Sequence, residues 1–106
     1  MGTIQHNAVI ATTWDEKEIR RLKKWISSLP KSWQGLFTVS SGVVNDYQTI
    51  TMSPDGSKEG WSDSEMGDEL RERFIAEINS PESHWEFVEV SFGELGQKIV
   101  QGNCEI

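Results

Sequence analysis

The chain of 106 residues is 36% hydrophobic and 25% charged, and its formal net charge at pH 7 is −7. A chain of this length builds one hydrophobic core but not two, so we expect a single domain over residues 1–106, with frayed ends at 1–7 and 102–106. Direct binding to nucleic acid is disfavoured, because neutralising phosphates requires a basic surface and most of this chain would repel them.

Sequence features also exclude several other classes of protein. No stretch approaches the roughly 18 to 20 consecutive apolar residues of a membrane span, and the first residues lack the basic region and long apolar segment of a signal peptide. We therefore expect a cytoplasmic protein that does not bind membranes. The single cysteine, Cys104, excludes an internal disulfide and a cysteine-based zinc site, and no motif points to a cofactor.

The strongest local signal lies in residues 8–30. It begins with a short apolar run of strand length, and Thr13 and Glu16 then have the spacing of a capping box. Pro30 cannot continue a helix, so we expect a helix over about residues 14–28. An apolar stripe runs along this helix through Ile19, Leu22, Ile26 and Leu29.

The rest of the chain predicts a second helix and further strands. A second capping box at residues 62–65 opens a helix that ends before Pro81. Its expected inner side chains are Met66, Leu70, Phe74, Ile75 and Ile78. Alternating or β-branched sequences predict strands at residues 36–40, 47–52, 85–92 and 97–101.

The predicted order of elements is β-α-β-β-α-β with an extra C-terminal strand. This is a ferredoxin-like α+β layout, in which two helices cover one face of a mainly antiparallel sheet. Right-handed crossovers place the first and fourth strands side by side and antiparallel, with the second strand at an edge. The resemblance concerns the layout alone, and a layout does not imply a function.

Charge is unevenly distributed along the chain. Residues 1–30 hold five basic and three acidic side chains, a balance of +2, whereas residues 55–94 hold twelve acidic and three basic ones, a balance of −9. The basic cluster on the first helix is interpreted as a solvated helix face, or as a patch for an acidic partner. It comprises Lys17, Arg20, Arg21, Lys23 and Lys24.

The acidic segment is the candidate binding site. We expect it to meet a basic surface of another protein, with Trp61 as an apolar anchor. Two alternatives are a solvated acidic face, since carboxylates at a helix start complement the helix dipole, and a divalent cation site, although the spacing is not that of an EF-hand. The candidate partner-binding residues are Asp55, Glu59, Trp61, Asp63, Glu65, Asp68, Glu69 and Glu72.

No sequence pattern points to catalysis. The two histidines, His6 and His84, are expected at opposite ends of the sheet, too far apart to share a metal or to act as an acid-base pair. The chain has no nucleophile elbow, no phosphate-binding glycine loop and no zinc-binding helix motif. We therefore expect no enzymatic activity and no metal.

The sequence thus favours a small acidic protein-binding module, an inhibitor or regulatory adaptor that is monomeric or homodimeric. One instance would be a viral inhibitor of a nucleic-acid-handling complex. A second class is a small-molecule-binding domain, with its ligand on the sheet face or in a dimer cleft lined by residues such as Tyr47 and Trp85. A third is a metal-assisted enzyme in which carboxylates converge. Self-association through an open strand edge is a further alternative.

Overall fold

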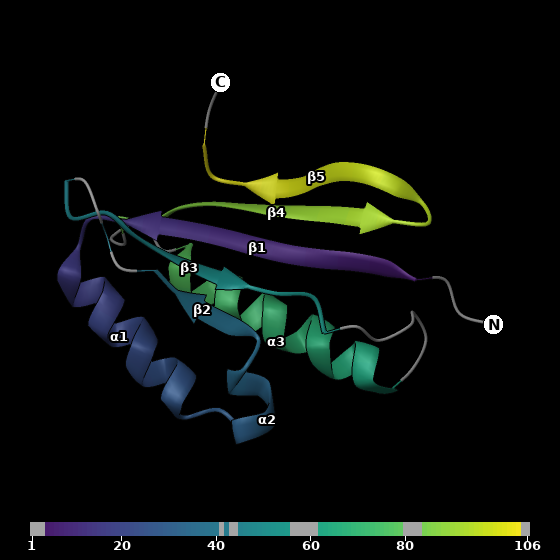
Figure 1. Ribbon diagram of the computed structural model, residues 1–106, viewed down its shortest axis with the longest axis horizontal. Coiled ribbons are helices and arrows are strands. Elements are labelled where there is room, and N and C mark those ends of the chain that lie inside the picture. Colours follow the sequence, from purple (N-terminus) through teal and green to yellow (C-terminus); the bar gives the residue numbers. More distant parts are fainter. Residues whose placement is uncertain (1–3, 41, 43–44, 56–61, 80–83, 105–106) are drawn as a thin grey trace.

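The computed structural model describes residues 4–40, 42, 45–55, 62–79 and 84–104. In this part of the chain the fold is α+β, with a five-stranded antiparallel sheet and three helices (Figure 1). No helix in these ranges is long and apolar enough to cross a membrane. The strands are β1 (Gln5–Thr13), β2 (Phe37–Val39), β3 (Gln48–Met52), β4 (Glu86–Gly93) and β5 (Gly96–Gly102). The helices are α1 (Glu16–Ser27), the short α2 (Lys31–Gln34) and α3 (Ser62–Ile78).

β1 is the central strand of the sheet. It pairs antiparallel with β3 on one side and with β4 on the other, and the strand order is β2-β3-β1-β4-β5. The predicted pairing of the first and fourth strands and the edge position of the second are confirmed. The ferredoxin-like order is not confirmed, because β5 pairs beside β4 and the resulting order is not that of a standard ferredoxin fold.

The tight turn between β4 and β5 explains the extra edge strand. Gly93 and Gly96 have φ angles of 146° and 90°, a region that side chains disfavour, and they enclose a turn of two residues. The chain therefore folds straight back along β4. Residues 5–7 and Gly102, which lie in the segments expected to fray, are paired in the sheet.

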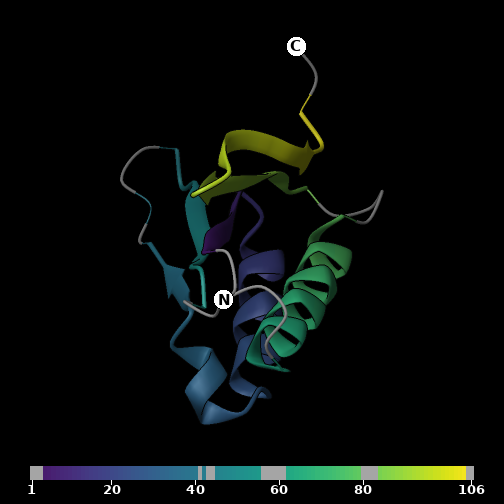
Figure 2. The same cartoon turned by 90° about the vertical axis from the view of Figure 1, so that its right-hand side faces the viewer.

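α1 and α3 lie side by side on one face of the sheet and leave the other face open (Figure 2). Alternation along the strands places the core side chains on the helix side, and Ile50 and Met52 of β3 are both buried there. The sheet contributes Val9, Ala11, Ile50, Met52 and Phe87 to this core. The helices contribute Ile19, Leu22, Leu70, Phe74, Ile75 and Ile78.

The start of α1 differs from the predicted capping box. Thr13 is still part of β1 and fully buried, and its hydroxyl donates to the main-chain oxygen of His84 over 2.7 Å. The N-cap is Asp15, whose carboxylate accepts from the main-chain N–H of Lys17 over 3.0 Å. The helix therefore starts at Glu16, two residues later than expected.

Candidate binding surfaces

The structure describes the side chains of five of the eight predicted partner-binding residues. Glu59 and Trp61 lie outside the described residues, as does the side chain of Asp63. The carboxylate of Asp55 occupies the place where a side chain on Gly67 of α3 would begin. The remaining four residues lie on α3, at Glu65, Asp68, Glu69 and Glu72.

Three of these carboxylates form one face of α3. Glu65, Glu69 and Glu72 are exposed and follow one another at spacings of four and three residues, which places them along one side of the helix. We call these three residues the acidic α3 face. Asp68 does not belong to it, because its carboxylate accepts from the guanidinium of Arg71 over 2.6 Å. Like charges at this spacing destabilise a helix by about 0.2–0.5 kcal/mol per pair, so a cation between them would be stabilising.

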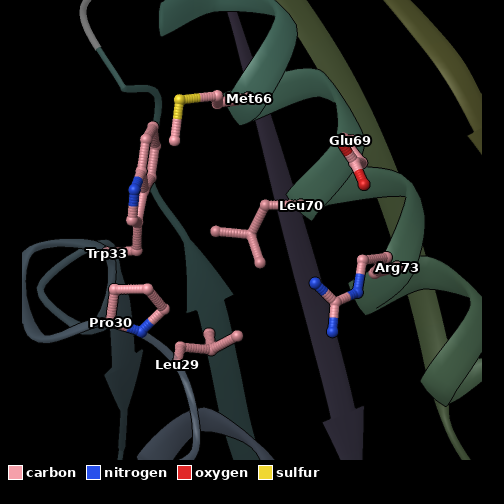
Figure 3. A pocket seen from close by; sticks show the side chains of 7 residues that line it. All are labelled: Leu29, Pro30, Trp33, Met66, Glu69, Leu70 and Arg73. Carbon is pink, nitrogen blue, oxygen red and sulfur yellow. The ribbon is translucent and has the colours of Figure 1, made fainter.

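A groove of about 150 Å³ lies beside this face, where the segment after α1 and the short α2 meet the middle of α3 (Figure 3). Its apolar side chains come from both sides, with Trp33 and Met66 facing the space above Leu70. Met66 is 52% exposed, so its predicted place on the inner side of α3 is wrong. We call this hollow the α2–α3 groove, and its lining residues are Leu29, Pro30, Trp33, Met66, Glu69, Leu70 and Arg73.

Two charged side chains border the α2–α3 groove. Glu69 and Arg73 lie one turn apart on α3, a spacing at which side chains of opposite charge can form an ion pair. The described ion pairs of α3 instead join Arg71 to Asp68 and Glu89, and Glu77 to Arg21, and none of them joins Glu69 to Arg73. A partner in the groove would therefore meet a carboxylate and a guanidinium that do not neutralise each other.

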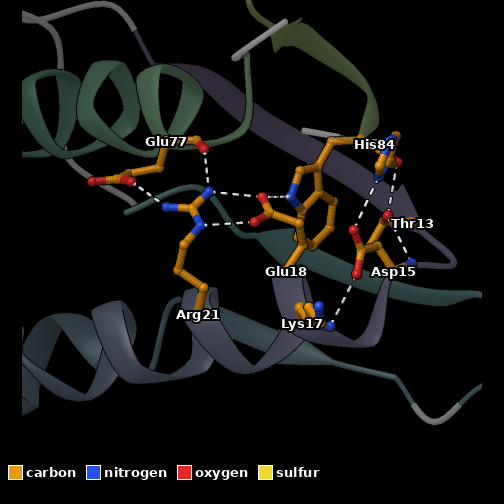
Figure 4. A network of polar contacts seen from close by, with 8 residues as sticks. Thr13, Asp15, Lys17, Glu18, Arg21, Glu77 and His84 are labelled. Atoms are coloured by element: carbon orange, nitrogen blue, oxygen red, sulfur yellow. Dashed lines mark hydrogen bonds and ion pairs between the residues drawn. The ribbon is translucent and has the colours of Figure 1, made fainter. Parts of the chain in front are cut away.

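A polar network ties α1 to the rest of the fold (Figure 4). Arg21 donates to the carboxylate of Glu18 over 2.8 Å, and to both the carboxylate and the main-chain oxygen of Glu77 over 2.6 Å. Glu18 also accepts from the indole N–H of Trp85 over 3.0 Å. The pKa of Glu18 is lowered mainly by the hydrogen bond from Arg21, and the carboxylates of Glu18 and Glu77 raise the pKa of Arg21.

The same network contains a histidine-carboxylate pair. His84 Nδ1 lies 3.0 Å from a carboxylate oxygen of Asp15, and its ring stacks on Trp14 at 4.7 Å between centroids. The hydrogen bond to His84 is the main cause of the lowered pKa of Asp15. Such a pair can orient a general base, but the hydroxyl beside it, that of Thr13, is buried and bonded to main-chain groups. These contacts give the pair a structural role at the start of α1.

The other predicted chemical groups do not come together. His6 packs on Phe92, with ring centroids 5.2 Å apart, at the opposite end of β1 from His84, so the predicted separation of the histidines is confirmed. Among the described residues, no three His, Cys, Asp or Glu side chains gather into a possible metal site. Trp85 is buried, so it does not line an open cleft with the exposed Tyr47.

Sequence reasoning missed the groove because its two sides are far apart in the chain. The helical form of α2 after Pro30, which brings Trp33 to the groove, is shown by the structure and was not predicted. No protein-family model, curated protein or solved structure matches the chain.

Proposed function

We propose that this chain is a non-catalytic protein-binding module that acts as an inhibitor or regulatory adaptor. The α2–α3 groove takes one apolar side chain of a partner, and the acidic α3 face contacts basic side chains next to it. The observation that carries this proposal is the position of Glu69, which borders the groove and belongs to the acidic α3 face. A single short segment of a partner can therefore meet both features.

The size and lining of the groove favour a side chain over a free small molecule. Sites for drug-sized ligands have volumes of about 300–1,000 Å³, whereas this groove has about 150 Å³. Trp33 offers a large apolar surface at a low entropic cost, and Met66 adapts its shape to what it contacts. Both residue types are enriched at protein interfaces.

Charge sets the expected chemistry of the partner. The carboxylates of Glu65, Glu69 and Glu72 favour lysine or arginine on the partner segment, and Arg73 favours a carboxylate or main-chain oxygen near the anchor. Attraction between exposed charges weakens as salt is added, so we expect binding to weaken between low and high ionic strength.

A peptide library tests the proposal. We expect the immobilised protein to select peptides with one large apolar residue flanked by Lys or Arg, over peptides with Asp or Glu at the flanks. Glu69→Lys should weaken binding of the selected peptides about tenfold or more, equivalent to about 1.4 kcal/mol. Glu94→Lys makes the same charge change in the exposed β4–β5 turn and should leave affinity within about twofold. Selection without a preference for basic flanks, or equal binding by both variants, would overturn the proposal.

We also propose that β1 to β4, α1 and α3 form a ferredoxin-like two-layer unit to which β5 is added at the edge. The position of β1 between β3 and β4 and the packing of both long helices on one face support this description. Hydrogen exchange tests it, because amides of an added strand should exchange through local opening while those of β1 and β3 require global unfolding. Equal protection in β5 and β1 would contradict the proposal.

A further inference from the structure

The sheet has an apolar face that the helices do not cover. Its side chains alternate with those of the core, and the strand register sets Ala8 beside Val90 and Val90 beside Ile99. Ile10 and Phe92 are each 43% exposed, and Ile99 is 72% exposed. We call this surface the open face, and its apolar residues are Ala8, Ile10, Val88, Val90, Phe92 and Ile99.

The open face is almost without charge, in contrast to the rest of the chain. By register, its polar side chains on β1 and β3 are His6 and a group of threonines, of which Thr12 and Thr49 are joined by a hydrogen bond of 2.9 Å. Among the described strand residues, the charged side chain on this face is Glu86, at the first position of β4. One quarter of all residues in the chain are charged, so this face differs from the remaining surface.

We propose that the open face binds a second copy of this chain, face to face. Each copy carries a net charge of −7, so two copies repel one another over most of their surfaces. The open face is an apolar region of the described strands where two copies can approach without bringing rows of carboxylates together. A strongly charged partner would find no complementary charges there, whereas an identical apolar face is complementary to it.

The arrangement of the strands is compatible with a two-fold axis. We place the two-fold axis above the open face, over β4 and parallel to the strands. β4 of one copy then faces β4 of the other, and β1 faces β5 of the second copy. All three strands carry apolar open-face residues, so the middle of the contact is apolar, and Glu86 lies at one end of it. The two sheets then pack about 10 Å apart, with their strands inclined by about 30°.

The size of the face predicts a weak dimer. The three contacting strands lie about 4.8 Å apart, and seven residues of each, at about 3.3 Å per residue, give a face of about 330 Å² in projection. Typical stable interfaces bury about 800 Å² per partner, so we expect a dissociation constant on the order of micromolar. The α2–α3 groove lies on the helix side of the sheet, so dimerisation leaves it accessible.

Sedimentation equilibrium of the full chain tests this proposal. We expect the wild-type mass to rise from monomer to dimer between about 1 and about 500 μM. Ile99→Lys should remain a monomer throughout, because it sets a cation on β5 against the apolar open-face residues of β1 in the second copy. Leu95→Lys is the matched control, since Leu95 is 76% exposed in the β4–β5 turn, off the open face, and should dimerise like the wild type. Circular dichroism confirms that each variant is folded, and Ile10→Thr replaces Ile99→Lys if the latter unfolds.

Several results would overturn the proposal. The first is a wild-type protein that stays monomeric at all concentrations, and the second is an Ile99→Lys variant that dimerises like the wild type. The third is loss of the dimer in Leu95→Lys alone, which would assign self-association to the β5 end of the sheet. If the protein stays monomeric and sediments together with phosphatidylcholine vesicles, the open face would be assigned to binding a lipid surface. Added salt separates this contact from groove binding, because screening should strengthen the apolar dimer of two anions and weaken binding of basic peptides.

Discussion

Arg71 of α3 donates through Nε to a carboxylate oxygen of Glu89 in β4 over 3.0 Å, and the two side chains are 17% and 5% exposed. Asn7 and Gln101 donate to the same carboxylate over 3.0 and 2.8 Å. These donors compensate for the hydration that Glu89 loses in the interior. The ion pair also joins α3 to the side of the sheet where β5 is added.

Removing one member of this pair is expected to be costly. Arg71→Met leaves the buried carboxylate of Glu89 without its cation, so the free energy of unfolding should fall by about 3–5 kcal/mol. The double variant Arg71→Met/Glu89→Leu should recover part of this loss, because it removes the buried charge as well. Urea denaturation measures both changes. Arg73→Met, at an exposed site on the same helix, should change stability by less than about 0.5 kcal/mol; similar losses in the two single variants would contradict the assigned role.

The hydroxyl of Thr13 is expected to stabilise the junction of β1 and α1. In Thr13→Val the main-chain N–H of Asp15 and the main-chain oxygen of His84 lose their partner, which should cost about 1–3 kcal/mol. Thr12→Val makes the same substitution one residue earlier, on the open face, and should cost less because that side chain is only half-buried. Chemical denaturation of the two variants gives the comparison, and an equal cost would show that the buried hydrogen bonds contribute little.

Asp15 and Glu18 predict a loss of stability in acid. Their pKa values lie below the ordinary values of 3.8 and 4.5, chiefly because His84 donates to Asp15 and Arg21 donates to Glu18. A carboxyl group with a lowered pKa stabilises the folded state above its unfolded pKa, and this contribution is lost as the pH falls through the folded value. The stability difference between wild type and Asp15→Asn should therefore shrink as the pH falls below about 5, and the difference between wild type and Glu18→Gln should shrink in the same way. Urea midpoints at several pH values measure it, and a constant difference would contradict the prediction.

Gly67 is a glycine that should resist the usual helix-stabilising replacement. Alanine in a helix interior is normally favoured over glycine by about 1 kcal/mol, but the carboxylate of Asp55 occupies the site of the new methyl group. We expect no gain from Gly67→Ala alone and a gain of about 1 kcal/mol in the Asp55→Ala background. Unfolding midpoints of the four proteins complete the cycle. A full gain in the presence of Asp55 would show that its carboxylate moves aside at little cost.

Local periodicity predicted the elements of this fold well. Alternation sets Ile50 and Met52 on one face of β3, and both are buried, while α1 ends before Pro30 within a residue of its predicted end. The predicted start of the first helix was wrong because a threonine at the end of a strand can either cap the next helix or bond to a neighbouring segment. The hydroxyl of Thr13 serves a distant strand connection through His84, and Asp15 then acts as the N-cap.

The orientation of β4 and the groove depended on residues far away in the sequence. The strand presents Val88, Val90 and Phe92 to the open face and buries Glu89 and Ser91, which is the reverse of what hydrophobicity alone favours. The burial of Glu89 is possible because Arg71 of α3 forms an ion pair with its carboxylate. The α2–α3 groove likewise forms because Trp33 lies near Met66, which is far away in the sequence. No local sequence pattern could therefore predict it.

The contact between Arg21 and Glu77 gives the helix pair unequal ends. Arg21 binds both the side chain and a terminal carbonyl of α3, whereas the middle of that helix faces the α2–α3 groove. Arg21 therefore holds α1 and α3 together at one end of the pair, and the α2–α3 groove lies toward the other end. A partner side chain between Trp33 and Met66 would therefore add a second connection across the helix layer, at the end away from Arg21.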